Sequence, residues 1–369
     1  MPAPLALPAL ALALSPTLAF APLLGGAASS GCEPSPADDV VRIVVAADGS
    51  GDATGAQEAV DLAPTDFAGR VEIVFEPGRY AGRVVVDPAH QRLSFLGSTG
   101  DPEDVVITDD RAAGTPRPGG GTWGTSGSAS VTIQGADFRA EAVTFENAFD
   151  EAAHPEFTGH QAVAVKTAAD RVAFDDVRFL GNQDTLYLDS PSATTPGRVY
   201  VHDSYVEGDV DFIFGRATAV LDDTTIKALP RASDPSGYIL APSTSAGFAR
   251  GFLVIDSTIV SDARDGSYYL GRPWHPSSAP DNDPRAVVRD TQLGTYLKND
   301  PWTTMSGYDW AADSNAEHDN HGPGAVVNEH RPQLSDAEAA DHEIDDYLAG
   351  ADGWAPQTKQ VKQAKQARR

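Results

Sequence analysis

The sequence predicts an all-β fold, a parallel β-helix whose coils stack on one another, and three observations carry this prediction. Short apolar runs of three to five residues, rich in Val, Ile, Phe and Thr, recur between Gly, Asn, Asp or Pro, a pattern typical of strands bounded by turns. The long helical stretches that βαβ units need do not separate these runs. Similar strand endings return every 25 to 35 residues or so, a period typical of stacked repeats.

The first elements are a strand from Val41 to Ala46, a tight turn at Asp48 to Asp52, and a short helix from Gly55 to Leu62 that caps the solenoid. We expect the helix to bury Ala56, Ala59, Val60 and Leu62. The apolar runs that follow predict these further strands: Val71–Phe75, Val84–Val86, Leu93–Leu96, Val105–Ile107, Val131–Ile133, Ala142–Phe145, Ala162–Val165, Val172–Phe174, Val177–Leu180, Thr185–Leu188, Val199–Val201, Ala219–Leu221 and Phe252–Ile255.

Strand endings supply the period. The three that resemble one another are Phe145-Glu146-Asn147, Leu180-Gly181-Asn182 and Val206-Glu207-Gly208. Coils of a parallel β-helix lie ~4.8 Å apart, the spacing of paired strands, so side chains one coil apart on the same face touch. We therefore expect residues separated by one period to meet.

Three segments outside the regular strands have their own signals. A Gly-rich loop from Gly114 to Ser130 contains Trp123 and is expected either to cover a cleft or to be disordered. Ser335 to Gly350 is expected to be a C-terminal helical segment, with Ser335 as N-cap and Glu338 three residues later. The β-helix domain is expected over residues 41–356, followed by a basic, Gln-rich, disordered tail over 357–369.

Residues 1–32 resemble a secretory signal peptide, because an Ala- and Leu-rich apolar stretch precedes a run of small residues. Three prolines within that stretch argue against a membrane span. No Lys or Arg precedes Arg42, so the positively charged N-terminal region that signal peptides usually have is missing. Cys32, the only cysteine, resembles a lipoprotein acceptor, although Ser29 stands where an aliphatic residue is preferred. We expect a secreted, extracellular protein, with lipid anchoring at Cys32 left open.

The charge is strongly acidic, with 53 Asp and Glu against 27 Lys and Arg and a formal net charge of −26. Like charges repel at long range, so this balance argues against nucleic acid or an anionic membrane as partner. Two explanations stay open: a solvated surface that keeps the protein soluble, and adaptation to high salt.

Two short segments carry the chemistry, Gly181–Tyr187 and Gly208–Gly215. They place Asp184 and Asp211 among apolar and aromatic residues, where an unpaired carboxylate is costly to bury. Two such residues at similar strand positions indicate a paired-carboxylate active site. The alternative is that both Asp are turn residues in a Gly- and Asp-rich repeat.

The period brings these carboxylates together with two glutamines. Asp184 and Asp211 are 27 positions apart, and Gln161 and Gln183 are 22 apart, so all four are expected on neighbouring coils of one face. Two adjacent carboxylates do not ionise independently, so we expect one pKa to rise and the other to fall. Glutamine amides donate hydrogen bonds to a developing oxyanion, although a structural amide ladder remains the alternative for Gln161.

A third segment, Tyr269–Trp274, adds a cation. Arg272 is suited to hold a carboxylate through a bidentate pair and to keep it ionised. Four aromatic residues offer flat faces on which sugar rings stack: Tyr187, Phe212, Phe214 and Trp274. For the two phenylalanines, packing in the core is the open alternative.

Together these segments resemble the pectin methylesterase (pectinesterase) family, whose fold is a right-handed parallel β-helix. The matching stretches are Gln161-Ala-Val-Ala-Val, Gly181-Asn-Gln-Asp-Thr-Leu-Tyr187, Asp209-Val-Asp-Phe-Ile-Phe-Gly215 and Leu270-Gly-Arg-Pro-Trp274, with weaker matches at Asp48–Asp52, Gln57–Val60 and Val143–Asn147. The resemblance covers roughly residues 41 to 356. One departure lies at Gly78–Gly82, where a Glu typical of the family is missing.

The resemblance implies hydrolysis of the methyl esters of polygalacturonate to pectate and methanol, by a monomer without metal or cofactor. It implies Asp211 as nucleophile, Asp184 as general acid and base, Gln183 and Gln161 as oxyanion donors, and Arg272 as the residue that orients Asp211. The implied groove residues are Tyr187, Phe214 and Trp274, with Phe212 as a further candidate.

Three alternatives remain open. Another pectin-active β-helix enzyme, a pectate lyase or a polygalacturonase, would not explain the glutamine pair. A non-catalytic β-helical carbohydrate-binding protein would not need Asp184 and Asp211 together. Glu317-His318-Asp319-Asn320-His321 has the residue types of a metal site, but the resemblance assigns it to a family loop that here ends in Gly322-Pro323-Gly324.

Overall fold

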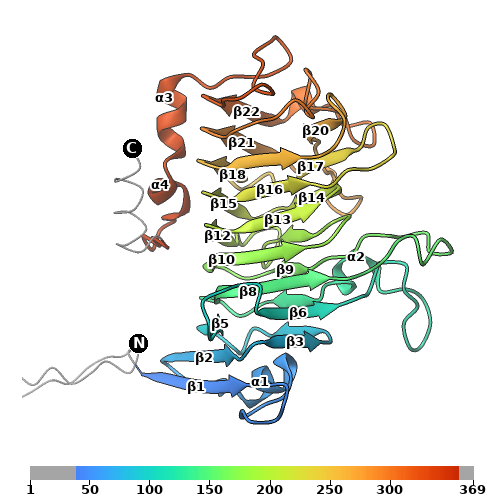
Figure 1. Ribbon diagram of the computed structural model, residues 1–369. Helices are drawn as coiled ribbons and strands as arrows, with labels where there is room; N and C mark the ends of the chain where they lie inside the picture. The colour runs from blue at the N-terminus through green and yellow to red at the C-terminus, as the bar shows by residue number, and fades with distance from the viewer. Residues whose placement is uncertain (1–38, 357–369) are drawn as a thin grey trace, which may run out of the picture. The chain divides into compact units, whose positions relative to one another are not determined.

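Parallel strands, stacked coil upon coil, form two sheets in the computed structural model, which describes residues 39–356 (Figure 1). The larger sheet has 15 strands: β1 (Val40–Val45), β2 (Arg70–Phe75), β3 (Gly78–Ala81), β5 (Leu93–Gly97), β6 (Val105–Asp109), β8 (Arg139–Asn147), β10 (Val172–Leu180), β12 (Arg198–His202), β13 (Tyr205–Gly208), β15 (Thr218–Asp222), β16 (Thr225–Ala228), β18 (Phe252–Ile255), β19 (Thr258–Ser261), β21 (Arg285–Arg289) and β22 (Ser314–His318). The smaller has seven: β4 (Val84–Val86), β7 (Val131–Ile133), β9 (Val165–Thr167), β11 (Leu186–Leu188), β14 (Val210–Gly215), β17 (Gly237–Pro242) and β20 (Tyr268–Gly271). The predicted parallel β-helix is confirmed.

The register of neighbouring coils confirms the predicted period and corrects one alignment. Phe179 in β10 pairs with Phe145 in β8 and with Val206 in β13. The second strand ending is therefore shifted by one residue from the alignment expected at Leu180, which pairs with Glu146. Because side chains alternate along a strand, this shift puts the fully buried Phe179 inside the solenoid and leaves Leu180 partly exposed.

Buried aromatic rings run through the core from coil to coil. Phe75 packs edge-on against Phe95 at 5.2 Å between centroids, and Phe174 packs edge-on against both Phe145 at 6.2 Å and Phe179 at 5.1 Å. Each fully buried apolar side chain contributes about 1.5–3 kcal/mol. This stacking holds the fold together without any disulfide, since the chain has one cysteine.

The N-terminal helix, α1 (Ala56–Leu62), caps one end of the stack (Figure 1). Ala56, Ala59 and Val60 are buried as predicted, but Leu62 is 54% exposed. Positions i, i+3 and i+4 share one helix face and position i+6 does not, so the expected burial of Leu62 was wrong.

The C-terminal segment is helical, as predicted, but broken. It contains α3 (Asp336–Ala339), the 3-10 turn η3 (Ala340–His342) and α4 (Ile344–Leu348), which lie beside the larger sheet (Figure 1). The predicted capping box is present, with Ser335 and Glu338 bonding reciprocally. Glu343 interrupts the helix with an extended backbone, φ −74° and ψ 139°.

Aspartates recur at the corners of the larger sheet in the left-handed backbone region. They have φ between 44° and 51°: Asp176, Asp203, Asp223, Asp256, Asp290 and Asp319. Asp tolerates this region better than most residues because its short polar side chain bonds locally. Five of them directly follow a strand, whereas Asp176 lies within β10.

Two shorter helical turns lie in connections, α2 (Gly124–Gly127) and η2 (Trp310–Ala312). The strand expected at Ala162–Val165 instead begins at Val165, and the preceding residues run as irregular but buried chain. None of the helices in residues 39–356 has the length and apolar character needed to cross a membrane. The predicted signal peptide (1–32) and tail (357–369) lie outside the described residues.

Candidate active site

Asp184 and Asp211 lie one coil apart, at the starts of two paired strands of the smaller sheet. Leu186 of β11 pairs with Ile213 of β14, so their separation of 27 positions is one coil. The backbone N–H of Asp184 donates to the carbonyl of Val210 at 3.0 Å. Each Asp is 7% exposed, with φ of 67° and 50° respectively.

Arg272 holds Asp211 through both carboxylate oxygens. Its Nε donates to Oδ1 at 2.8 Å and a terminal nitrogen donates to Oδ2 at 2.6 Å. The guanidinium carbon also lies 3.5 Å from the ring centroid of Tyr238, a cation–π contact that fixes its plane. Arg272 directly follows β20, the neighbour of β17, so the coil stacking delivers it to Asp211.

The two carboxylates differ in what surrounds them. Burial raises the pKa of Asp184 well above its ordinary value, and the neighbouring Asp211 carboxylate raises it further. Burial also raises the pKa of Asp211, but the bidentate bond and charge of Arg272 oppose that rise. Asp211 is therefore the carboxylate whose ionised form is hydrogen-bonded to a guanidinium. The expectation that one pKa falls below its ordinary value was wrong, because burial acts on both groups.

The two glutamines lie on adjacent coils at the same edge. The backbone N–H of Ala162, next to Gln161, donates to the carbonyl of Gln183 at 3.0 Å. A hydrogen bond from the Gln183 side chain to Asp184 partly offsets the rise in that carboxyl's pKa. Both glutamine residues are half-buried, and the side chain of Gln183 reaches the Asp184 carboxyl.

An aromatic wall borders the carboxylates. Tyr187 stacks on Phe214 at 4.2 Å between centroids, and Trp274 packs against both rings at 6.1 and 5.6 Å. Phe212 instead is completely buried in the main core. Alternate residues of a strand point to opposite faces, so Phe214 reaches the wall and Phe212 does not, and the expectation of Phe212 in a groove is corrected.

A pocket of about 400 Å³ opens beside this wall. Tyr187 and Trp274 line it together with Trp123, Gly124 and Ser126, which belong to the Gly-rich segment 114–130. Of the two expectations for that segment, the structure supports the first: it forms one side of a cleft. Figure 1 shows α2 of this segment beside β9 and β8.

Several charged or aromatic residues near the site were missed in the sequence. Tyr238 lies 28 positions after Val210, its strand partner, so the coil period could have predicted that Tyr238 lies next to this segment. Lys166, Asp189 and Arg216 form an ion-pair group next to Tyr187, and no motif marks them. Asp209, whose pKa burial raises to about 6, pairs with Arg231.

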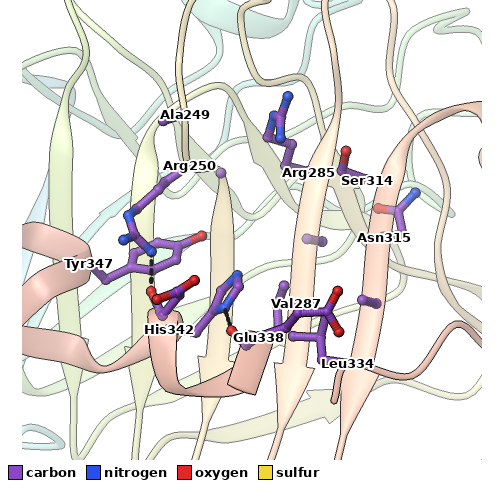
Figure 2. A pocket seen from close by; sticks show the side chains of 14 residues that line it. Ala249, Arg250, Arg285, Val287, Ser314, Asn315, Leu334, Glu338, His342 and Tyr347 are labelled. Carbon is purple, nitrogen blue, oxygen red and sulfur yellow. Dashed lines mark hydrogen bonds between the residues drawn. The ribbon is translucent and has the colours of Figure 1, made fainter. Parts of the chain in front are cut away.

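A second pocket, of about 490 Å³, lies between the C-terminal helices and the larger sheet. Figure 2 shows Arg250, Tyr347 and His342 on one side of it and Arg285 and Asn315 on the other. None of the predicted site residues lines this pocket. Tyr187 and Trp274, two of the predicted groove residues, line the first pocket, so the first pocket is the candidate substrate groove.

The segment from Glu317 to His321 is used structurally. Glu317 is 1% exposed and accepts hydrogen bonds from Arg331 and from the indole N–H of Trp302. Across residues 39–356, no three His, Cys, Asp or Glu side chains gather as a metal-binding group.

Comparisons with known proteins agree on one family. A family model described as Pectinesterase matches residues 42–350. Pectinesterase 31 of Arabidopsis thaliana is 35% identical over 309 residues, which cover 80% of this chain and 88% of that protein. A pectin methylesterase crystallised with hexasaccharide VII superposes with a TM-score of 0.78 at 30% identity and covers 85% of this chain and 98% of that one. The enzyme from Erwinia chrysanthemi gives 0.77 at 29% identity, over 86% and 98% of the two chains.

Proposed function

The chain belongs to the pectinesterase family, and from that premise we propose how its buried carboxylates carry out the reaction. It hydrolyses the methyl esters of pectin to pectate and methanol. The observation that carries the mechanism is the contrast within the pair: burial and the Asp211 carboxylate raise the pKa of Asp184, whereas Arg272 holds Asp211 through two hydrogen bonds. We propose that Asp184 is protonated and Asp211 ionised when the substrate binds.

In the first half of the reaction, an Asp211 carboxylate oxygen attacks the carbonyl carbon of a galacturonate methyl ester. The carbonyl oxygen becomes an oxyanion, which the amide N–H groups of Gln183 and Gln161 stabilise. When the intermediate collapses, the bond to the methoxy oxygen breaks and Asp184 donates its proton, so methanol leaves. The remaining species is an anhydride between Asp211 and the galacturonate.

In the second half, Asp184 is a carboxylate and removes a proton from water. The resulting hydroxide attacks the galacturonate carbonyl, the same amide groups hold the second oxyanion, and Asp211 leaves as a carboxylate. Asp184 ends protonated, as it began. Arg272 keeps Asp211 ionised and oriented at both stages, because a bidentate guanidinium favours the charged form.

The aromatic wall supports a groove for a polysaccharide. Tyr187, Phe214 and Trp274 pack into one aromatic cluster, and Tyr187, Trp274 and Trp123 line one pocket. A structural relative binds a hexasaccharide. We also propose that the protein works as an extracellular monomer, which its polymeric substrate and the resemblance of residues 1–32 to a signal peptide support. Lipid anchoring at Cys32 stays an alternative.

The direct test is to add purified protein to highly methylated pectin and to measure methanol and acid released. We expect equal amounts of both, without shortened or unsaturated chains, and the same rate in EDTA, since amide and guanidinium groups supply the charge stabilisation. Unsaturated products would point to a lyase and shortened chains to a polygalacturonase. Loss of activity in EDTA that Ca²⁺ restores would contradict the metal-independent mechanism.

A pH profile tests the role of Arg272. In Arg272→Met, Asp211 loses the cation that opposes the burial-driven rise in its pKa. The nucleophile must be ionised to react. In the variant, activity should therefore begin to fall at a less acidic pH as the pH is lowered, and the acid limb of the kcat/KM profile should move up by about one to three pH units. Arg264→Met, which removes a cation that is 61% exposed, is the matched control and should leave that limb in place. An unmoved acid limb in Arg272→Met would show that Arg272 does not set the ionisation of Asp211.

A further inference from the structure

The loop that follows Trp274 forms part of the candidate substrate groove. Pro276 and Ala279 of this loop line the same pocket as Trp274 itself. Residues 275–283 contain no helix or strand, so no regular backbone ladder fixes the course of the loop. Its position, and with it the position of the Trp274 ring, must therefore depend on particular side-chain contacts.

His275, the residue directly after Trp274, makes three such contacts. Its Nδ1 lies 3.0 Å from the carbonyl oxygen of Pro280, which links the two ends of the loop. Its ring stacks on Tyr308 with 3.9 Å between centroids and 7° between planes. Its Nε2 lies 3.5 Å from Oδ1 of Asp313. The imidazole therefore joins the loop to the connection that contains η2, far along the chain.

The contact between His275 and Asp313 needs one proton. A carbonyl oxygen only accepts hydrogen bonds, so the contact with Pro280 fixes a proton on Nδ1 of His275. A neutral ring then presents the lone pair of Nε2 to Asp313, and a carboxylate would repel that lone pair. The contact is attractive when a proton lies between Nε2 and Oδ1, carried by an imidazolium or by a carboxylic acid.

The surroundings of this pair leave few other partners. The side chains of His275 and Asp313 are each 7% exposed. Within residues 39–356, neither His275 Nε2 nor Asp313 Oδ2 has a hydrogen bond of ordinary geometry. Burial raises the pKa of Asp313, His275 opposes that rise, and the carboxylates of Asp283 and Asp309 add to it; Asp283 is itself paired with Arg285. Because unsatisfied buried polar groups are costly, the bridging proton holds the two side chains together.

We propose that His275 and Asp313, joined through one proton, position Trp274 and the loop after it for binding the polysaccharide. The inference rests on the proposed function, which supplies the polymer. Neither residue lines the groove pocket, so both act through Trp274 and the loop as positioning residues. A displaced Trp274 ring weakens the binding of the polymer equally before and during the reaction, which raises KM and leaves kcat unchanged.

The test measures kcat and KM for methanol release from highly methylated pectin in three variants. His275→Phe keeps a ring to stack on Tyr308 but removes both polar contacts. We expect its KM to rise about three- to tenfold, with kcat within about twofold of wild type. Asp313→Leu should raise KM in the same way, because Nε2 loses its partner. Asp313→Asn should keep the wild-type KM, because an amide N–H donates to Nε2 in place of the bridging proton.

The matched control is His330→Phe, since the side chain of His330 is 53% exposed, and its KM should equal that of wild type. An unchanged KM in both His275→Phe and Asp313→Leu would overturn the proposal, even if both variants unfolded at a lower temperature. An equal rise in Asp313→Asn and Asp313→Leu would overturn it too. If His275→Phe does not fold, the two Asp313 variants still decide. A wild-type protein that releases no methanol would instead refute the proposed function.

Discussion

Asp211→Asn and Asp184→Asn should each lower kcat for methanol release by at least about 10³-fold, as nucleophile and acid–base losses do. Asn, rather than Ala, is the informative substitution, because both residues have positive φ and Asn tolerates that region. The backbone is therefore kept while the charge is removed. The measurement is steady-state methanol release, with circular dichroism to verify folding.

The double variant shows whether the two carboxylates act in one cycle. Each step of the proposed mechanism needs both groups, so the double variant should be no more than a few-fold slower than the worse single variant. Asp203→Asn is the matched control, since Asp203 is an exposed corner residue with a φ of 44°, and it should retain full activity. Losses that multiply in the double variant would mean that the two residues act independently.

Glu317→Ala should cost about 3–5 kcal/mol of unfolding free energy, because it leaves the buried Arg331 without its counter-charge. The side chains of Glu317 and Arg331 are 2% and 1% exposed. Glu317 also accepts from the indole of Trp302 at 3.2 Å and from the amide of Asn320 at 3.2 Å, so several buried donors lose their acceptor together. Denaturant unfolding followed by Trp fluorescence measures the loss.

Glu329→Ala is the control for Glu317→Ala. The Glu329 side chain is 88% exposed beside His330, so its removal should change the unfolding free energy by less than about 0.5 kcal/mol. A cost below about 1 kcal/mol for Glu317→Ala would show that water reaches Arg331. The segment of Glu317 would then not have the structural role that its contacts indicate.

Local signals in the sequence predicted much of the fold. Apolar runs between Gly and Asp predicted strands such as β4, β7 and β18, and the capping-box spacing predicted the start of α3. The short strands β3, β16 and β19 were missed because each has few apolar residues in a row. In a solenoid, such strands are stabilised mainly by the coils above and below, so their own sequence need not have a strong strand pattern.

The sequence by itself determined the period, and with it the placement of residues 161, 183, 184 and 211 on neighbouring coils, because spacing along a regular solenoid translates into stacking. Only the tertiary structure decided which way individual side chains point: Phe214 to the wall, Phe212 to the core. It also decided the surroundings of the pair: burial raises the pKa of both carboxyls, and Arg272 opposes that rise at Asp211. The roles of Tyr238 and of the ion-pair group of Lys166, Asp189 and Arg216 were likewise found only in the tertiary structure. Desolvation and ion pairing depend on distances in space, and residues from separate coils set those distances together.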